Sequence, residues 1–231
     1  MSLDLDIFIV AYHAKEELSD TLGSIALWTT PGYRLTVYDN ADRNYPLTWL
    51  WNRFIEQSKR KFIALLNPDI VLSDCWAAEA IACFCEHHDC GVVGFLANHR
   101  FYKHHFPSIN LEEFTPSEGR SVAEATKRNG LPRFLFSKDF EAAPGHAFVI
   151  RRGAWERVGG FDERLPFAGN DYDFNRRVLE VGMKIVVCNH AAVWHKGNRS
   201  TKCAKALGTF NKVADMPGFS TPPSGLKFDG L

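Results

Sequence analysis

Residues 7–12 have the sequence Ile-Phe-Ile-Val-Ala-Tyr, a continuous run without a charged or turn-forming side chain. Such a run is typical of a strand that is buried on both faces of a parallel sheet. Leu18 and Leu22 follow at helical spacing, and Pro31 and Gly32 mark the end of that helix. The start of the chain therefore predicts a strand followed by a helix.

The same alternation continues along the chain. Further strands are predicted at 35–38, 62–66, 92–96, 147–150, 185–187 and 192–194, and further helices at 47–55, 75–87 and 172–181. Alternating strands and helices indicate a parallel α/β sheet with right-handed crossovers. Ligands bind such sheets beyond the carboxyl ends of the strands. Tyr12, Asp39 and Asp69 each follow a predicted strand, which places the candidate site at that edge.

The alternation stops between residues 98 and 141, in a long polar segment with a basic cluster. The cluster consists of His99, Arg100, Lys103, His104 and His105. A segment of this length without clear elements is usually functional or mobile. We interpret the cluster as a solvated loop, with contact to an anionic acceptor or a membrane surface as the alternative.

The composition limits the class of protein. The 231 residues are 45% hydrophobic, and 27 basic residues balance 27 acidic ones. This excludes a disordered chain and does not indicate a nucleic-acid partner. No apolar run approaches the roughly 20 residues of a membrane span, and Asp4 and Asp6 stand where a signal peptide is basic. The sequence predicts a soluble, cytoplasmic protein whose membrane contact would be peripheral.

The six cysteines lack the paired Cys-x-x-Cys spacing of a zinc site and the density of a disulfide scaffold. Cys83 and Cys85 lie in a predicted helix, so we interpret them as buried thiols. Zinc binding is the minor alternative.

Asp69 belongs to the triplet Asn67-Pro68-Asp69. The proline ends the strand and fixes φ, so the carboxylate should project from a stiff turn. Mg²⁺ and Mn²⁺ prefer carboxylate and phosphate oxygens, which makes Asp69 a candidate metal ligand. A simple turn whose side chain bonds its own backbone is an equal alternative.

Asp171 stands in the first turn of the helix predicted near residue 172, together with Asn170 and Asp173. These side chains could cap the helix and complement its dipole. The same dipole would keep Asp171 ionised, as a general base requires. Capping is the favoured interpretation from spacing alone.

Two further pairs follow strands. His195 and Lys196 come after the apolar run at 192–194, where they could contact a metal or phosphate or could be structural. Asp39 and Asn40 could bind a nucleobase or form an Asx turn. No Gly-x-Gly-x-x-Gly, Gly-Lys-Ser/Thr or Gly-x-Ser-x-Gly motif occurs, which argues against dinucleotide-binding, P-loop and hydrolase sites.

In this order, these residues resemble the inverting family-2 glycosyltransferases with the GT-A fold, particularly the rhamnosyltransferase-like members. The matching segments are 9–12, 38–40, 65–70, 91–94, 159–163, 170–173 and 194–195. The resemblance implies an α/β, Rossmann-like GT-A sandwich whose central, mostly parallel twisted sheet is flanked by helices. It implies one catalytic domain over residues 1–200, with a nucleotide-sugar half (1–97) and an acceptor half (98–200). Residues 201–231 are expected to form a tail or flap.

The resemblance also implies roles for individual residues. Asp69 and His195 would hold Mn²⁺ or Mg²⁺ near the diphosphate, and Asp171 would be the catalytic base. The implied donor-binding residues are Ala11, Tyr12, Asp39, Asn40, Asn67 and Lys196. The implied acceptor-side residues are Asp162, Glu163 and Asn170.

Three features depart from the family pattern. Asn170 replaces the first acid of a Glu-Asp pair, Asn67 replaces an aspartate of many relatives, and the chain between Asp39 and Asp69 is short. The expected activity is transfer of a sugar from a UDP- or dTDP-type donor to a glycan or lipid-linked acceptor. A catalytically degenerate nucleotide- or glycan-binding module is the alternative. A nucleotidyltransferase is disfavoured because its glycine-rich basic loop is absent.

Overall fold

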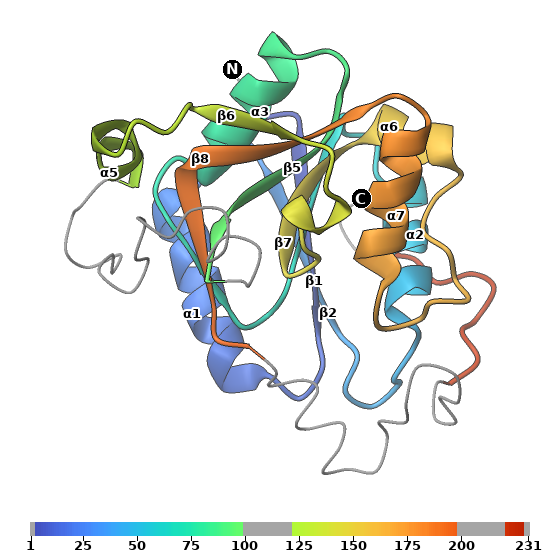
Figure 1. Ribbon diagram of the computed structural model, residues 1–231. Helices are drawn as coiled ribbons and strands as arrows, with labels where there is room; N and C mark the ends of the chain where they lie inside the picture. The colour runs from blue at the N-terminus through green and yellow to red at the C-terminus, as the bar shows by residue number, and fades with distance from the viewer. Residues whose placement is uncertain (1–2, 99–121, 198–219, 229–231) are drawn as a thin grey trace.

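A mixed sheet organises the residues that the computed structural model describes, which are 3–98, 122–197 and 220–228 (Figure 1). Eight strands form it in the order β2-β1-β3-β7-β5-β8-β4, and β6 pairs with β8. Their bounds are β1 Leu5–Ala11, β2 Arg34–Asp39, β3 Phe62–Leu66, β4 Ile70–Leu72, β5 Cys90–Ala97, β6 Phe134–Ser137, β7 Ala147–Arg151 and β8 Lys184–His195.

Most strands share one direction. β1 is parallel to both β2 and β3, and β8 is parallel to β5. β7 lies antiparallel between β3 and β5, so β5 and β8 point the same way as β1. β4 and β6 run antiparallel to β8. The predicted α/β sandwich with a mostly parallel sheet is therefore confirmed.

Helices cover both faces of the sheet. α1 (Lys15–Trp28) and α3 (Trp76–Glu86) lie on one face, and α2 (Leu47–Gln57), α6 (Arg152–Val158) and α7 (Asn170–Glu180) lie on the other (Figure 1). α5 (Val122–Arg128) contacts β8. Because side chains alternate along a strand, Ile7 and Ile9 face the α1–α3 layer, whereas Phe8 faces the α2 layer. Burial on both faces explains the continuous apolar run of β1.

Several elements were not predicted. α5 and β6 lie inside the segment 98–141, where we expected no regular structure, and β4 and α6 were also missed. The runs at 185–187 and 192–194 belong to one strand, β8, which is irregular between Cys188 and Ala192. The basic cluster at 99–105 lies outside the described residues.

The C-terminal segment 220–228 packs on the domain. Phe228 is buried, and its ring centroid lies 5.1 Å from that of Phe8 and 5.7 Å from that of Phe54. Gln57 of α2 donates to the Leu226 carbonyl at 2.8 Å and accepts from the Phe228 amide at 3.1 Å. Residues 220–228 therefore form a segment that is docked on the core.

We expect Phe228→Ala to lower the free energy of unfolding by about 3 kcal/mol, since it removes a buried aromatic ring. Urea unfolding followed by circular dichroism measures this change. Lys227→Ala, at an exposed neighbouring position, is the matched control. Equal midpoints for the two variants would contradict the docking of this segment.

The described cysteines are all unpaired thiols. Cys83, Cys90 and Cys188 are buried, whereas Cys75 and Cys85 are exposed. The prediction of a buried thiol is thus correct for Cys83 and wrong for Cys85, because Cys85 lies on the outer side of α3. Within the described ranges, no His, Cys, Asp and Glu side chains form a group of three that could hold a metal.

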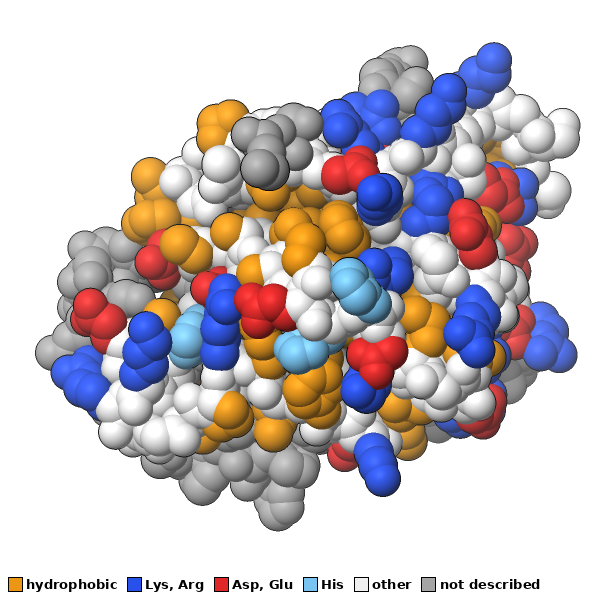
Figure 2. Space-filling model, turned by 90° about the horizontal axis from the view of Figure 1, so that it is seen from above, with side chains coloured by type: hydrophobic (Ala, Val, Ile, Leu, Met, Phe, Trp, Pro, Cys, Tyr) orange, Lys and Arg blue, Asp and Glu red, His pale blue; other side chains and the backbone are white. Residues whose placement is uncertain are grey.

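The face at the top of Figure 1 carries lysine, arginine and acidic side chains side by side, with apolar patches between them (Figure 2). This mixture agrees with the balanced overall charge. None of the helices in the described part of the chain combines the length and apolar character needed to cross a membrane.

Candidate active site

Asp69 occupies a turn that α1 holds in place. The Thr21 hydroxyl of α1 lies 2.8 Å from the Pro68 carbonyl oxygen and 2.7 Å from that of Ile70, and it accepts from the Ile70 amide at 3.1 Å. Both Thr21 and Asp69 are buried, the latter with only 2% of its surface exposed. The turn is therefore stiffened by the buried Thr21 hydroxyl as well as by Pro68, the one residue to which we had assigned this role from the sequence.

His195, the last residue of β8, lies against Asp69. Its Nε2 is 3.1 Å from Asp69 Oδ1 and 3.3 Å from Asn67 Nδ2. Its main-chain amide donates to Asn98 Oδ1 at 2.8 Å, and Asn98 Nδ2 donates back to the His195 carbonyl at 2.9 Å. The Lys196 amide donates to the Asp69 carbonyl at 2.9 Å. The structure thus brings together three predicted site residues, Asn67, Asp69 and His195.

The Asp69–His195 pair has the spacing of two neighbouring ligands of one ion. Ligands that lie about 2.1 Å from an octahedral Mg²⁺ ion are about 3.0 Å apart, close to the observed 3.1 Å. Such ions usually keep water and substrate oxygens in their remaining positions. The two side chains fit a divalent cation as a partial set of ligands, and the described residues supply no third His, Cys, Asp or Glu.

Asp171 lies in the first turn of α7, which begins after Gly169, a residue with φ of 74°. Its Oδ2 accepts a 2.6 Å hydrogen bond from the Gly145 amide, 26 residues earlier in the chain. The N-cap residue is glycine and makes no side-chain cap bond. The capping interpretation is corrected only for the Asp171 side chain, which bonds the loop before β7. Asp171 and Asp173 still lie in the first turn of α7, where they complement the helix dipole.

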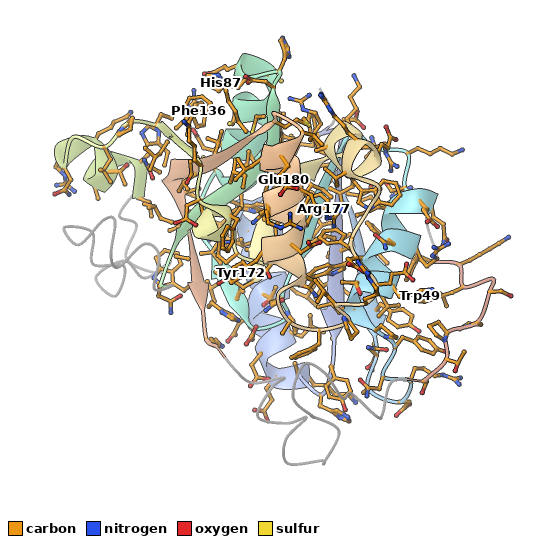
Figure 3. All side chains as sticks on the ribbon, turned by 45° about the vertical axis from the view of Figure 1, so that its right-hand side comes forward. Trp49, His87, Phe136, Tyr172, Arg177 and Glu180 are labelled. Carbon is orange, nitrogen blue, oxygen red and sulfur yellow. The ribbon has the colours of Figure 1, made fainter. Side chains whose placement is uncertain are left out.

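The rest of α7 is anchored by Arg177, which is labelled in Figure 3. Its Nη1 lies 2.8 Å from both the Val158 and the Gly160 carbonyl oxygens. Its Nε donates to Asp173 at 2.8 Å, which gives Asp173 a structural role. The helix that carries Asp171 is thereby fixed to the end of α6.

The dipeptide Gly145-His146 lies between Asp171 and the Asp69–His195 pair and contacts both. It precedes β7, whose first residue Ala147 pairs with Leu66 at the end of β3. The Asn67 amide donates to the His146 carbonyl at 2.8 Å. The His146 ring stacks on that of His195, with centroids 4.8 Å apart and planes at 12°. Sequence reasoning missed His146, because only the antiparallel pairing of β7 brings it to this edge.

The acceptor-side candidates have different environments. Arg164 holds Asp162 through Nε at 2.9 Å and Nη2 at 2.7 Å, and these hydrogen bonds lower the pKa of Asp162 to about 2. Glu163 accepts from Asn52 Nδ2 at 3.0 Å. Asn170 is only 3% exposed, and its Nδ2 has no hydrogen-bond partner among the described residues. Only Asn170 adjoins Asp171, with its Oδ1 2.7 Å from the Asp171 amide.

The donor-side candidates lie at the ends of β1 and β2. Ala11 pairs with Asp39, and its carbonyl accepts from the Asn40 amide at 2.7 Å. The exposed Asp39 carboxylate accepts from the Ala41 amide at 3.0 Å, so the Asx turn is present. The side chain of Asn40 bonds the Tyr45 amide and carbonyl at 2.8 and 2.9 Å. It therefore shapes its own loop.

The remaining two candidates are Tyr12 and Lys196. Tyr12 is partly buried and packs edge-on against His13, with centroids 4.5 Å apart. Lys196 forms an ion pair with Asp20 on α1. The ammonium group thus lies beside α1, whose Thr21 bonds the Asp69 turn and whose Ser24 accepts from the Leu72 amide of β4.

We expect Arg164→Ala to raise the pKa of Asp162 from about 2 towards its ordinary value of 3.8, because the variant removes the guanidinium hydrogen bonds. Carboxyl carbon chemical shifts measured by NMR between pH 1.5 and 6 report this pKa. Arg176→Ala, which removes an exposed partner of Asp173 instead, should leave it unchanged. An unaltered pKa in Arg164→Ala would contradict this contact.

Comparisons with known proteins found a matching family, a distant relative and solved structures of similar fold. The profile of a family described as "Glycosyltransferase like family 2" matches residues 4–208. The O-antigen biosynthesis protein RfbC of Myxococcus xanthus is 20% identical over 186 residues, which are 79% of this chain and 14% of that protein. The chain thus spans about one seventh of the length of that curated relative.

Two solved structures share the fold. A structure of GalNAc-T7 with UDP, GalNAc and Mn²⁺ has a TM-score of 0.58 at 12% identity, over 84% of this chain and 44% of the other. S. aureus TarS, residues 1–349, has a TM-score of 0.55 at 13% identity, over 90% of this chain and 64% of the other. At these identities the likeness establishes the fold, which is that of GT-A glycosyltransferases.

Proposed function

The chain belongs to the glycosyltransferase-like family 2, and from this we propose that it transfers a sugar from a UDP- or dTDP-type donor to an acceptor hydroxyl with inversion. One observation carries the proposal. A helix-terminal carboxylate, Asp171, and a cation-compatible pair, Asp69 and His195, are linked at one sheet edge by Gly145 and His146. A general base and a binding site for the leaving group at the same sheet edge are what a single-displacement reaction requires.

We assign Asp171 the role of the general base. The N-terminus of α7 and the Gly145 amide both favour the ionised carboxylate, which is the form that accepts a proton. The acceptor oxygen forms a bond to the anomeric carbon as its proton passes to Asp171. The bond from that carbon to the donor diphosphate breaks, and its electron pair leaves with the diphosphate. One displacement from the opposite face inverts the anomeric centre.

Asp69 and His195 are assigned to the leaving group. A bound Mn²⁺ or Mg²⁺ ion would supply positive charge that offsets the charge developing on the nucleoside diphosphate. The structure of GalNAc-T7 with UDP and Mn²⁺ supports this assignment by analogy of fold. Lys196 is assigned a phosphate contact, reached by exchanging its partner Asp20 for the diphosphate.

The remaining assignments concern the two substrates. Asp39 contacts the nucleobase and Asn40 shapes that loop, while Ala11 and Tyr12 line the end of β1. Asn170, with its unpaired buried amide, positions the acceptor beside Asp171, and Asp162 and Glu163 line the acceptor side. The O-antigen biosynthesis relative supports a glycan or lipid-linked acceptor and therefore a place in polysaccharide synthesis. A lipid-linked acceptor would require peripheral membrane contact.

A catalytically degenerate module that binds nucleotide or glycan is the second candidate. It is favoured by Asn170, which places a buried, unpaired amide where the family resemblance implies an acid, and by the incomplete cation pair. Its fold and binding edge would be the same, so only turnover separates the two functions.

Calorimetry with UDP and dTDP, with and without Mn²⁺, followed by product analysis on nucleotide sugars, tests the proposal. We expect Mn²⁺ to strengthen nucleotide binding to the wild type but not to Asp69→Asn. Binding without turnover on any acceptor would favour the binding module. If no nucleoside diphosphate bound with any divalent metal, the transferase and the nucleotide-binding form of the module would both be wrong.

A further inference from the structure

We propose that His146 is a positioning residue that holds the imidazole of His195 in the orientation required for cation binding. The inference rests on the proposed function, because it concerns the same Asp69–His195 pair. His146 is itself buried, with 7% of its surface exposed, and its ring faces that of His195 at a centroid distance of 4.8 Å.

The main chain of His195 is already fixed by Asn98, but these bonds do not set the plane of the ring. Near-parallel stacking at 12° leaves the ring edge, and with it Nε2, directed at Asp69 Oδ1 3.1 Å away. Asp69 and Asn67 contact the ring at a single atom, Nε2, and the His195 side chain is 24% exposed, so these contacts leave the tilt of the ring open. A second ring stacked on its face restricts that tilt.

His146 is well placed to act as that neighbour. The Asn67 amide bonds its carbonyl, and the adjoining Ala147 is in register with Leu66, so its main chain belongs to the rigid sheet edge. The Gly145 amide on its other side bonds Asp171. The short segment Gly145-His146 therefore contacts both the His195 imidazole and the Asp171 carboxylate.

The geometry assigns His146 to positioning and not to ligation. Its ring lies over the face of His195, and the described residues include no set of three metal-binding side chains. Partners that orient a ligating histidine typically change metal affinity by 10- to 100-fold when they are mutated. Phenylalanine, which keeps a flat ring, should therefore preserve the positioning of His195, whereas alanine, which keeps only a methyl group, should not.

The test compares His146→Ala and His146→Phe with His190→Ala, which removes another buried histidine, one that lies in the same strand as His195. Mn²⁺ affinity in the presence of UDP is measured by electron paramagnetic resonance. We expect about a 10-fold loss in His146→Ala, near-complete rescue in His146→Phe and no loss in His190→Ala. Wild-type affinity in His146→Ala would overturn the proposal. Equal losses in the alanine and phenylalanine variants would overturn it as well, in favour of a ligand role.

A second measurement separates this proposal from the proposed function. If the wild type binds no Mn²⁺, the metal part of the proposed function fails, but NMR of the histidine side chains still tests the stacking. We expect the His195 ring protons to lose their ring-current shift in His146→Ala and to keep it in His146→Phe. Identical His195 signals in the wild type and His146→Ala would overturn the positioning role without reference to any cation.

Discussion

Asp171→Asn is expected to lower kcat by roughly 10²- to 10⁴-fold, the range that a general base contributes. An amide has the same shape as the carboxylate but accepts no proton from the acceptor hydroxyl. Its oxygen can still accept the 2.6 Å hydrogen bond from the Gly145 amide, so the loop before β7 should be retained. Steady-state rates of sugar transfer measure kcat, and calorimetry with UDP and Mn²⁺ measures donor-side binding separately.

The matched control is Asp173→Asn, two residues further along α7. Asp173 pairs with Arg176 and Arg177 and lies in the same helical turn, so its removal tests the loss of an acid near the helix start. We expect this variant to keep most of its kcat, because Arg177 retains its carbonyl partners Val158 and Gly160. Equal losses in both variants would identify a general effect on α7 and would contradict the role of Asp171 as the base.

Local patterns predicted the strands and helices that form the centre of the fold. β1 and β3 were visible because burial on both faces requires continuous apolar sequence, and α2 and α7 were visible from their spacing. β4 was missed because a three-residue strand carries no periodicity, and it forms only by pairing with β8. The docking of Phe228 depends on contacts with Phe8 of β1 and Phe54 of α2, which lie far from it in the chain, and so has no local signal.

The site was predicted unevenly for the same reason. Asp69 follows a strand, Asp171 lies in the first turn of a helix and His195 ends a strand, and such positions can be recognised from sequence. Gly145 and His146 became visible only when the antiparallel strand β7 placed the loop before it beside the end of β3. Side chains that position others act through tertiary contacts, so their roles cannot be derived from spacing.

Gly145→Ala is expected to lower kcat by about 10-fold while leaving the binding of UDP and Mn²⁺ unchanged. A Cβ atom at position 145 would lie 3.0 Å from Asp171 Cβ and 3.1 Å from its Cγ and Oδ2. Real Cβ contacts are rarely so short, so the Asp171 side chain must give by a few tenths of an ångström. A displacement of about 1 Å in a reacting group can cost about 10²-fold in rate, so this smaller shift should cost about 10-fold.

Gly153→Ala is the control, because a Cβ atom there meets nothing within 4 Å and the residue lies in helix α6. It should keep its kcat and gain stability of about 0.5–1 kcal/mol, as alanine does over glycine inside a helix. A double-mutant cycle then locates the cause of the loss at Gly145. If the new methyl group acts through Asp171 alone, Gly145→Ala should cost nothing further in the Asp171→Asn background. A full additional loss in that background would mean that the loop carrying His146 has moved as well.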